Sequence, residues 1–130
     1  MSAEPWLKPL RRRRTWLGMW WLAIATVIVA CLLPGSDLPK LPVNDKLEHA
    51  LAFLLLAASA VQLVRRGRPL LVIGLGLLAL GIAIELAQHL FTTSRAMEPA
   101  DVLADGIGIV LGMATAWTPL RDVLLDLDRL

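Results

Sequence analysis

Charge is scarce in this sequence. Only 18% of its 130 residues are charged and 57% are hydrophobic, which is too apolar for an ordinary soluble domain of this length. Cysteine is nearly absent as well. The single Cys31 cannot form an intramolecular disulfide, so cysteine usage does not report the redox compartment. The composition predicts one domain whose solvent is a lipid bilayer.

Four long apolar stretches are present. A bilayer core requires about 20 apolar helical residues, and residues 16–33, 47–64, 69–91 and 102–117 come close to that length. The last stretch is short, which favours a start near Pro99 or Asp101. We therefore expect an all-α fold, a four-helix transmembrane bundle (residues 16–117) that follows a basic N-terminus (residues 1–15).

Residues 118–130 predict a short amphipathic interfacial helix after the bundle. Its apolar residues recur at helical spacing, at Leu120, Val123, Leu124, Leu127 and Leu130. Its charged residues lie opposite to them, at Arg121, Asp122, Asp126 and Asp128.

Basic residues cluster at the ends of the predicted spans, where such residues determine the orientation of a membrane protein. We therefore expect no nucleic-acid partner. One side of the membrane receives Lys8, Arg11, Arg12, Arg13, Arg14, Arg65, Arg66, Arg68, Arg121 and Arg129. The other side receives Lys40, Lys46 and Arg95. This asymmetry predicts that both termini are cytoplasmic. Interfacial anchors are expected at Trp16, Trp20, Trp21 and Trp117.

Two processing signals offer an alternative for the first span. "RRTWL" (13–17) resembles a twin-arginine export signal, and "IVAC" (28–31) resembles a lipoprotein cleavage box. The apolar run continues beyond Cys31, which favours a plain first span.

Three spans carry an ionisable residue near the outer end. With a helical rise of 1.5 Å per residue, His49 lies about 6 Å inside a span that starts at Asp45, and Asp105 lies equally deep after Asp101. Glu85 lies about 7 to 8 Å inside the end of the third span. These groups are therefore expected in one layer.

Residues three or four positions apart share a helix face, so each of these helices can present a polar stripe. The stripes are Asp45, Lys46 and His49; Glu85 with Gln88 or His89; and Asp101 with Asp105. Small residues predict close backbone approach below the stripes: Ala79, Ala83 and Ala87 in the third span, and Ala104, Gly108 and Gly112 in the fourth.

An uncompensated charge at membrane depth costs several kcal/mol. The acids of this layer outnumber its bases, Lys46 and Arg95; they are Asp45, Glu48, Glu85, Asp101 and Asp105. Protonation of a carboxyl group or of His49, a bound cation, or a cationic ligand group could each balance the charge. The sequence alone does not distinguish among these ways of balancing the charge. A purely structural alternative is that Lys46 and Glu48 mark the water boundary while Glu85 and Asp105 lock the bundle through buried hydrogen bonds.

Three motifs taken together resemble the VanZ-like family of small bacterial membrane proteins: DKLEHALAF (45–53), ELAQ (85–88) and SRAMEPADVLADGIGIVLG (94–112). The family's Asp-Lys-x-x-His and Glu-x-x-Gln patterns are met by Asp45, Lys46, His49, Glu85 and Gln88. Its arginine and its Asp-x-x-x-Asn-x-x-Gly-x-x-x-Gly helix are matched by Arg95, Asp101, Gly108 and Gly112. Asp105 departs from the pattern, because asparagine is usual at that position.

The resemblance implies a multi-pass protein of the bacterial cytoplasmic membrane, with a role in the cell envelope and a link to low-level resistance to the glycopeptide teicoplanin. It does not imply a mechanism or a cofactor.

The leading hypothesis is an enzyme that acts at the outer leaflet on an anionic envelope lipid or a cell-wall precursor. His49, Glu85, Asp101 and Asp105 are the candidate catalytic residues. Asp45, Lys46, Gln88 and Arg95 are the candidate ligand-binding residues. The alternative is a non-catalytic membrane protein that binds a lipid head group with the same residues or stabilises the envelope.

Two further interpretations rank lower. We predict no metal: four of the candidate side chains could bind a divalent ion, but no HExxH or cysteine-based spacing supports one. An ion or proton path would need polar residues deeper in the spans. At that depth Gln62 is nearly the only polar residue.

Overall fold

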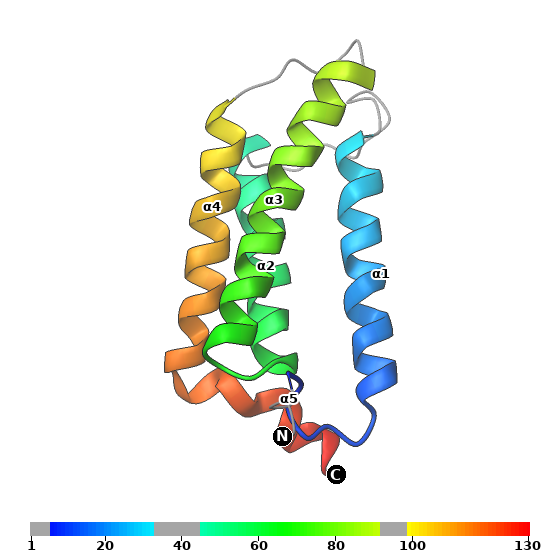
Figure 1. Cartoon of the computed structure of the whole chain (residues 1–130), viewed down its shortest axis with the longest axis vertical. Coiled ribbons are helices and arrows are strands. Elements are labelled where there is room, and N and C mark those ends of the chain that lie inside the picture. Colours follow the sequence, from blue (N-terminus) through cyan, green and yellow to red (C-terminus); the bar gives the residue numbers. More distant parts are fainter. Residues whose placement is uncertain (1–5, 33–44, 92–98) are drawn as a thin grey trace.

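Four long helices run up and down to form a bundle, and a short C-terminal helix lies across one end of it (Figure 1). The computed structural model describes residues 6–32, 45–91 and 99–130. The long helices are α1 (Arg13–Leu32), α2 (Asp45–Leu63), α3 (Arg68–Phe91) and α4 (Pro99–Ala114). The 3-10 helices η2 (Thr115–Trp117) and η3 (Pro119–Asp122) then lead into α5 (Val123–Asp128). The described residues contain no strand, and the predicted all-α bundle is confirmed.

All four long helices have the length and apolar composition needed to cross a membrane. The candidate spans are Arg13–Leu32, Lys46–Leu63, Arg68–Leu90 and Pro99–Trp117, close to the predicted boundaries. Large apolar side chains cover the outside of the bundle, for example Leu55, Leu75 and Val110. Such a surface suits lipid as the surrounding solvent, so the chain is a multi-pass membrane protein.

The two ends of the bundle differ in chemistry. At one end α2 and α4 begin and α3 finishes, and we call it the site end. At the opposite end lie residues 6–12, the turn at residues 65–67 and α5 (Figure 1). We call this the basic end, because its connections carry most of the arginines. The N-terminal segment from residue 6 and the C-terminus both lie at the basic end, on one side of the bundle (Figure 1).

Helix α2 occupies the centre of the bundle and makes its most extensive contacts with α4. Its buried side chains include Phe53, Ala57 and Val61. A Cβ atom at Gly108 of α4 would strike the backbone carbonyl oxygen of Ala50, so this pair packs backbone against backbone. The predicted close approach through Gly108 and Gly112 is therefore observed.

The small-residue stripe predicted on α3 is wrong. Ala79 and Ala83 are exposed on the outside of the bundle, and only Ala87 is part-buried. Helix α3 approaches α4 through two glycines instead: Gly74 faces Met113, and Gly81 faces Asp105. Because α3 is apolar around most of its circumference, its sequence does not mark which face meets a neighbouring helix.

The N-terminal segment packs across the end of α2. Leu7 forms an antiparallel bridge with Val64, the amide of Lys8 donates to Leu63 O (2.9 Å), and the amide of Arg65 donates to Trp6 O (2.8 Å). Gln62 fastens the C-terminal tail, since its Nε2 donates to Leu120 O (2.8 Å) and its Oε1 accepts from the amide of Leu124 (3.0 Å).

The solvent-facing position predicted for Asp128 is wrong. Its side chain is fully buried and accepts hydrogen bonds from the indole Nε1 of Trp16 (2.9 Å) and from the amides of Arg11 and Arg12. These amides lie in the turn directly before α1, and the indole belongs to the first turns of that helix. Asp128 therefore joins α5 to the beginning of α1.

Trp20 was expected as an interfacial anchor, but it is buried and donates to Leu56 O (3.1 Å). Trp21 and Trp117 are exposed as predicted. Along the tail the predicted apolar face is largely outward, with Leu120, Val123, Leu127 and Leu130 exposed. Leu125 fills the contact with the bundle instead.

Candidate functional site

Three helices bring ionisable side chains together at the site end. His49 comes from the first turns of α2, Glu85 from the last turns of α3, and Asp101 and Asp105 from the first turns of α4. All four side chains are buried, and Glu85 and Asp105 are each only 1% exposed. Alternating helix direction places these residues at a common level, as their distance from the helix ends predicts.

His49 and Asp105 form the shortest described contact of this group. His49 Nδ1 lies 3.1 Å from Asp105 Oδ1, and both side chains are buried. A protonated Nδ1 donates to this carboxylate, which fixes the orientation of the imidazole ring. The ring then presents its other nitrogen, Nε2, to Asp101, whose Oδ2 lies 4.0 Å away.

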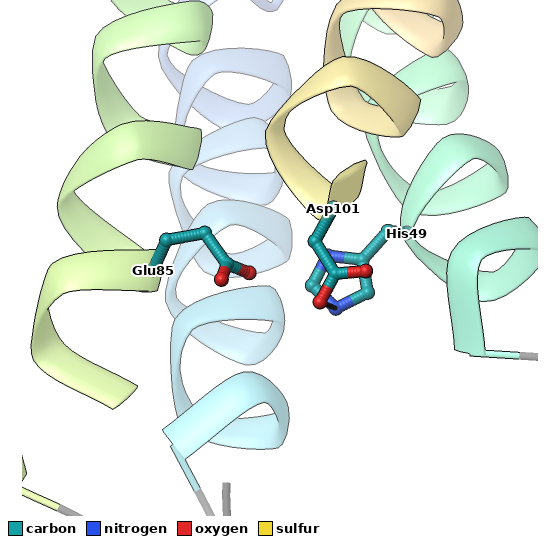
Figure 2. Close-up of side chains that lie close together, drawn as sticks. All are labelled: His49, Glu85 and Asp101. Atoms are coloured by element: carbon teal, nitrogen blue, oxygen red, sulfur yellow. Dashed lines mark ion pairs between the residues drawn. The ribbon is translucent and has the colours of Figure 1, made fainter. Parts of the chain in front are cut away.

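Glu85 completes the cluster from the opposite helix. Figure 2 shows its side chain extending from α3 toward Asp101 and His49. One ligand-type atom from each of His49, Glu85 and Asp101 can be chosen so that all three lie within 4.8 Å of one another. One imidazole nitrogen and two carboxylate oxygens can relay protons or hold a divalent cation.

Lys46 stands at the edge of this cluster. Its Nζ lies 3.9 Å from Asp101 Oδ1, and half of its side chain remains exposed. It can therefore reach the buried carboxylate and a group outside the bundle from the same position. Asp101 also lies in the first turn of α4, where the positive end of the helix dipole favours a carboxylate.

Gln88 has a different neighbour from the other candidates. It is buried, and its Nε2 donates to Cys31 O over 2.7 Å. Cys31 belongs to the last turn of α1, whose carbonyl groups lack partners within the helix. This contact ties α3 to α1 directly beside the cluster. His89, the alternative to Gln88 in the predicted stripe, is exposed.

The sequence analysis missed one residue of the site, Gly81. A Cβ atom at this position would lie 2.7 Å from Asp105 Oδ2, so the carboxylate occupies the space that a side chain would take. This Oδ2 atom is buried and has no hydrogen-bond partner among the described residues. The only signal in the sequence was the position of Gly81 four residues before Glu85, on the same helix face.

Two predicted ligand-binding residues are not placed. Arg95 lies outside the described residues, and Asp45 begins α2 with a side chain that is outside the description. Glu48 is part-buried on α2. The described site thus consists of His49, Glu85, Asp101 and Asp105, with Lys46 and Gln88 beside them.

The described part of the site is rich in carboxyl groups. Among the described residues, three buried carboxyl groups, from Glu85, Asp101 and Asp105, lie beside one imidazole and one half-exposed ammonium group. Ionised carboxylates are costly to bury together, so protons or positively charged groups in contact with this cluster stabilise it.

Comparison of the chain with protein-family models, with curated proteins and with solved structures gives no match.

Proposed function

We propose that this chain is a VanZ-like protein of the bacterial cytoplasmic membrane whose site end faces outward, where it acts on an anionic envelope lipid or a cell-wall precursor. The observation that carries the proposal is the buried contact between His49 and Asp105, together with the close approach of Glu85 and Asp101 to the same imidazole. The order of the three motifs along the chain supports the family, and the arginine-rich opposite end supports the orientation.

In this proposal His49 is the general base or acid. Asp105 holds its Nδ1, so that Nε2 exchanges a proton with the substrate or with Asp101. Glu85 is the second acid–base group, because it reaches the same space from α3. Lys46 binds the anionic head group at the edge of the site, where its side chain is half exposed. Arg95 is the second candidate cation for that head group.

In a second candidate function, the same residues bind a divalent cation. The close approach of ligand atoms from His49, Glu85 and Asp101 favours it. A carboxylate on the far nitrogen of a metal-binding histidine is also a common supporting contact, and Asp105 provides it here. The cation would offset the buried carboxylates and polarise a phosphate or carbonyl oxygen.

The test compares cells that carry the wild-type chain, Glu85→Gln or His49→Ala. His89→Ala is the matched control, because it removes the only other histidine, which is exposed on the same helix as Glu85. Extracted lipids and cell-wall precursors are profiled by mass spectrometry, and teicoplanin susceptibility is measured. The proposal predicts that both site variants, but not His89→Ala, lose the wild-type lipid or precursor profile.

Other outcomes are equally informative. The site variants could leave the lipid and precursor profiles unchanged while the purified variant proteins no longer retain a lipid head group. That result would show a binding protein rather than an enzyme. Binding of Zn²⁺ or Mn²⁺ to purified wild-type protein, lost in Glu85→Gln, would favour the metal-dependent form. Site variants that match the wild type in every readout would contradict the proposal.

A further inference from the structure

A second polar region lies at the basic end, far from the site described above. Here the N-terminal segment, the end of α2, the start of α3 and the C-terminal tail line an open cavity of about 580 Å³. Figure 1 shows these segments gathered at one end of the bundle. The charged residues that line the cavity are Lys8, Arg65, Arg66, Arg68, Arg121 and Asp122.

The charge of this cavity is strongly positive, because five basic residues share one acidic residue. That acid, Asp122, lies 3.0 Å from Lys8 Nζ and 3.7 Å from Arg121 Nε. Within the described chain, no carboxylate pairs with Arg65, Arg66 or Arg68. Three guanidinium groups at one cavity therefore have no described carboxylate beside them.

Two of these arginines are held in place without being neutralised. Arg65 Nε donates to Leu7 O over 3.2 Å, and one terminal nitrogen of Arg66 donates to Ala116 O over 3.4 Å. Arg66 also lies over the ring of Trp117, 5.8 Å from its centroid. A carbonyl acceptor orients a guanidinium group but carries no net charge, and each guanidinium has further N–H donors to offer.

The walls of the cavity are fixed by backbone contacts as well. Residues 7 and 64 are bridged, and Lys8 Nζ donates to Arg121 O, which fastens the N-terminal segment to the tail. Gly67, with a φ of 105°, makes the tight turn between α2 and α3 that brings Arg65, Arg66 and Arg68 to one side. Arg65 and Arg66 are thus oriented in part before any ligand arrives, which reduces the entropy lost on binding.

We propose that this cavity binds the phosphate group of an anionic phospholipid. Guanidinium groups match the geometry of phosphate oxygens and bind them through paired N–H donors. The cavity lies at the last turn of α2 and the first turn of α3, the ends of two candidate membrane spans, where lipid head groups meet a membrane-spanning bundle. Basic cavities at this level are typical binding sites for acidic lipids. The inference does not depend on the function proposed for the site end.

The test measures lipid binding to delipidated protein in detergent by native mass spectrometry. Phosphatidylglycerol is compared with phosphatidylcholine of the same acyl chains, which carries a phosphate but no net charge. We expect preferential binding of phosphatidylglycerol to the wild type. Replacement of both Arg66 and Arg68 by Gln is expected to weaken that binding about tenfold or more, because charge-assisted hydrogen bonds to phosphate are lost.

The matched control replaces Arg14 and Arg129 by Gln, which removes the same charge from residues that do not line the cavity. It is expected to bind phosphatidylglycerol like the wild type. Arg68→Gln alone serves as a second variant, since no described hydrogen bond or ion pair involves its side chain. It should weaken binding while leaving thermal unfolding of the lipid-free protein unchanged.

Inorganic phosphate distinguishes the two sources of the ligand group. Competition by millimolar phosphate would show that the cavity accepts the free ion, and lipid binding that resists phosphate would show that the acyl chains contribute. Equal binding of the two lipids by the wild type would overturn the proposal. The proposal would also be overturned if the cavity variant and the matched control lost phosphatidylglycerol binding to the same extent.

Discussion

Asp105 has two carboxylate oxygens in different surroundings. Oδ1 faces the imidazole of His49 at 3.1 Å, whereas Oδ2 lies against Gly81 of α3 with no hydrogen-bond partner among the described residues. One side chain thus contacts both neighbouring helices at the level of the site. The proposed VanZ-like family usually has asparagine at this position, and an asparagine could accept the same hydrogen bond from His49 through its own oxygen.

This geometry predicts different outcomes for two substitutions of Asp105. Asp105→Ala should lower the free energy of unfolding by about 1 to 3 kcal/mol, because His49 Nδ1 would be buried without its partner. Asp105→Asn should lower it much less, since the acceptor oxygen remains. Thermal or denaturant unfolding of the purified variants in detergent measures both. Equal losses in the two variants would show that the contact with His49 does not determine stability.

At the scale of elements, two joints rely on different chemistry: the contact between α2 and α4, which is the most extensive between helices, and the hydrogen bonds that connect α5 to the start of α1. The first uses glycine, so that backbone meets backbone at Gly108 and Gly112. The second uses a single buried carboxylate, Asp128, and the indole of Trp16. Helices that face lipid gain little from hydrophobic association, so close packing and hydrogen bonds hold them together.

A methyl group at the first joint should separate the helices. Gly108→Ala would place its Cβ against Ala50 O and 3.0 Å from Leu54 N, both backbone atoms that cannot rotate away. We expect a loss of about 1 to 3 kcal/mol in unfolding free energy. Gly76→Ala on α3 is the control, since nothing lies within 4 Å of its Cβ, and it should be neutral or slightly stabilising. Similar effects of both substitutions would contradict the close approach.

The second joint should respond to pH. Burial raises the pKa of Asp128, but hydrogen bonds from Trp16 and from the amides of Arg11 and Arg12, with the charge of Arg12, outweigh burial and leave this pKa below its usual value. A carboxyl group with a lowered folded-state pKa stabilises the fold fully above its unfolded-state pKa of about 4. That contribution is lost as the pH falls through the folded-state pKa.

The measurement is the difference in unfolding free energy between the wild type and Asp128→Asn as a function of pH. It should be largest above about pH 5 and should shrink below about pH 4. Asp126→Asn is the control, because this exposed residue makes only a 3.9 Å ion pair with Arg129, and its difference should stay close to zero throughout. If Asp128→Asn lowered the unfolding free energy by the same amount at every pH, the carboxylate would not be the stabilising form of Asp128.

At the scale of the whole molecule, the sequence predicted the spans, the level of the polar residues and the close face of α4, but not the apolar inner face of α3. Span boundaries follow from apolar length, and His49, Glu85 and Asp105 stand out because charge is costly at that depth. The inner face of α3 was predicted at Ala79 and Ala83, which are exposed, and Gly81 was overlooked. A helix that is apolar all round carries little contrast between lipid-facing and protein-facing sides.

Asp128 and Trp20 illustrate a related limit. Both were assigned to the surface by residue type, and both are buried because a specific partner satisfies their polar atoms. Such partners come from residues far apart in the sequence, Asp128 with Trp16 and Trp20 with Leu56. Local spacing along one helix therefore could not reveal them.

The central claim is that side chains from three helices face one another at the site end. Cross-linking within single chains tests it, with Cys31→Ser as background and cysteine introduced at positions 49 and 85. A bifunctional thiol reagent with a short spacer should join this pair, as it should join a control pair at 7 and 64 across the observed bridge. A pair at 49 and 89 should remain unlinked, because His89 is exposed away from the cluster. A linked control pair together with an unlinked 49–85 pair would contradict the account.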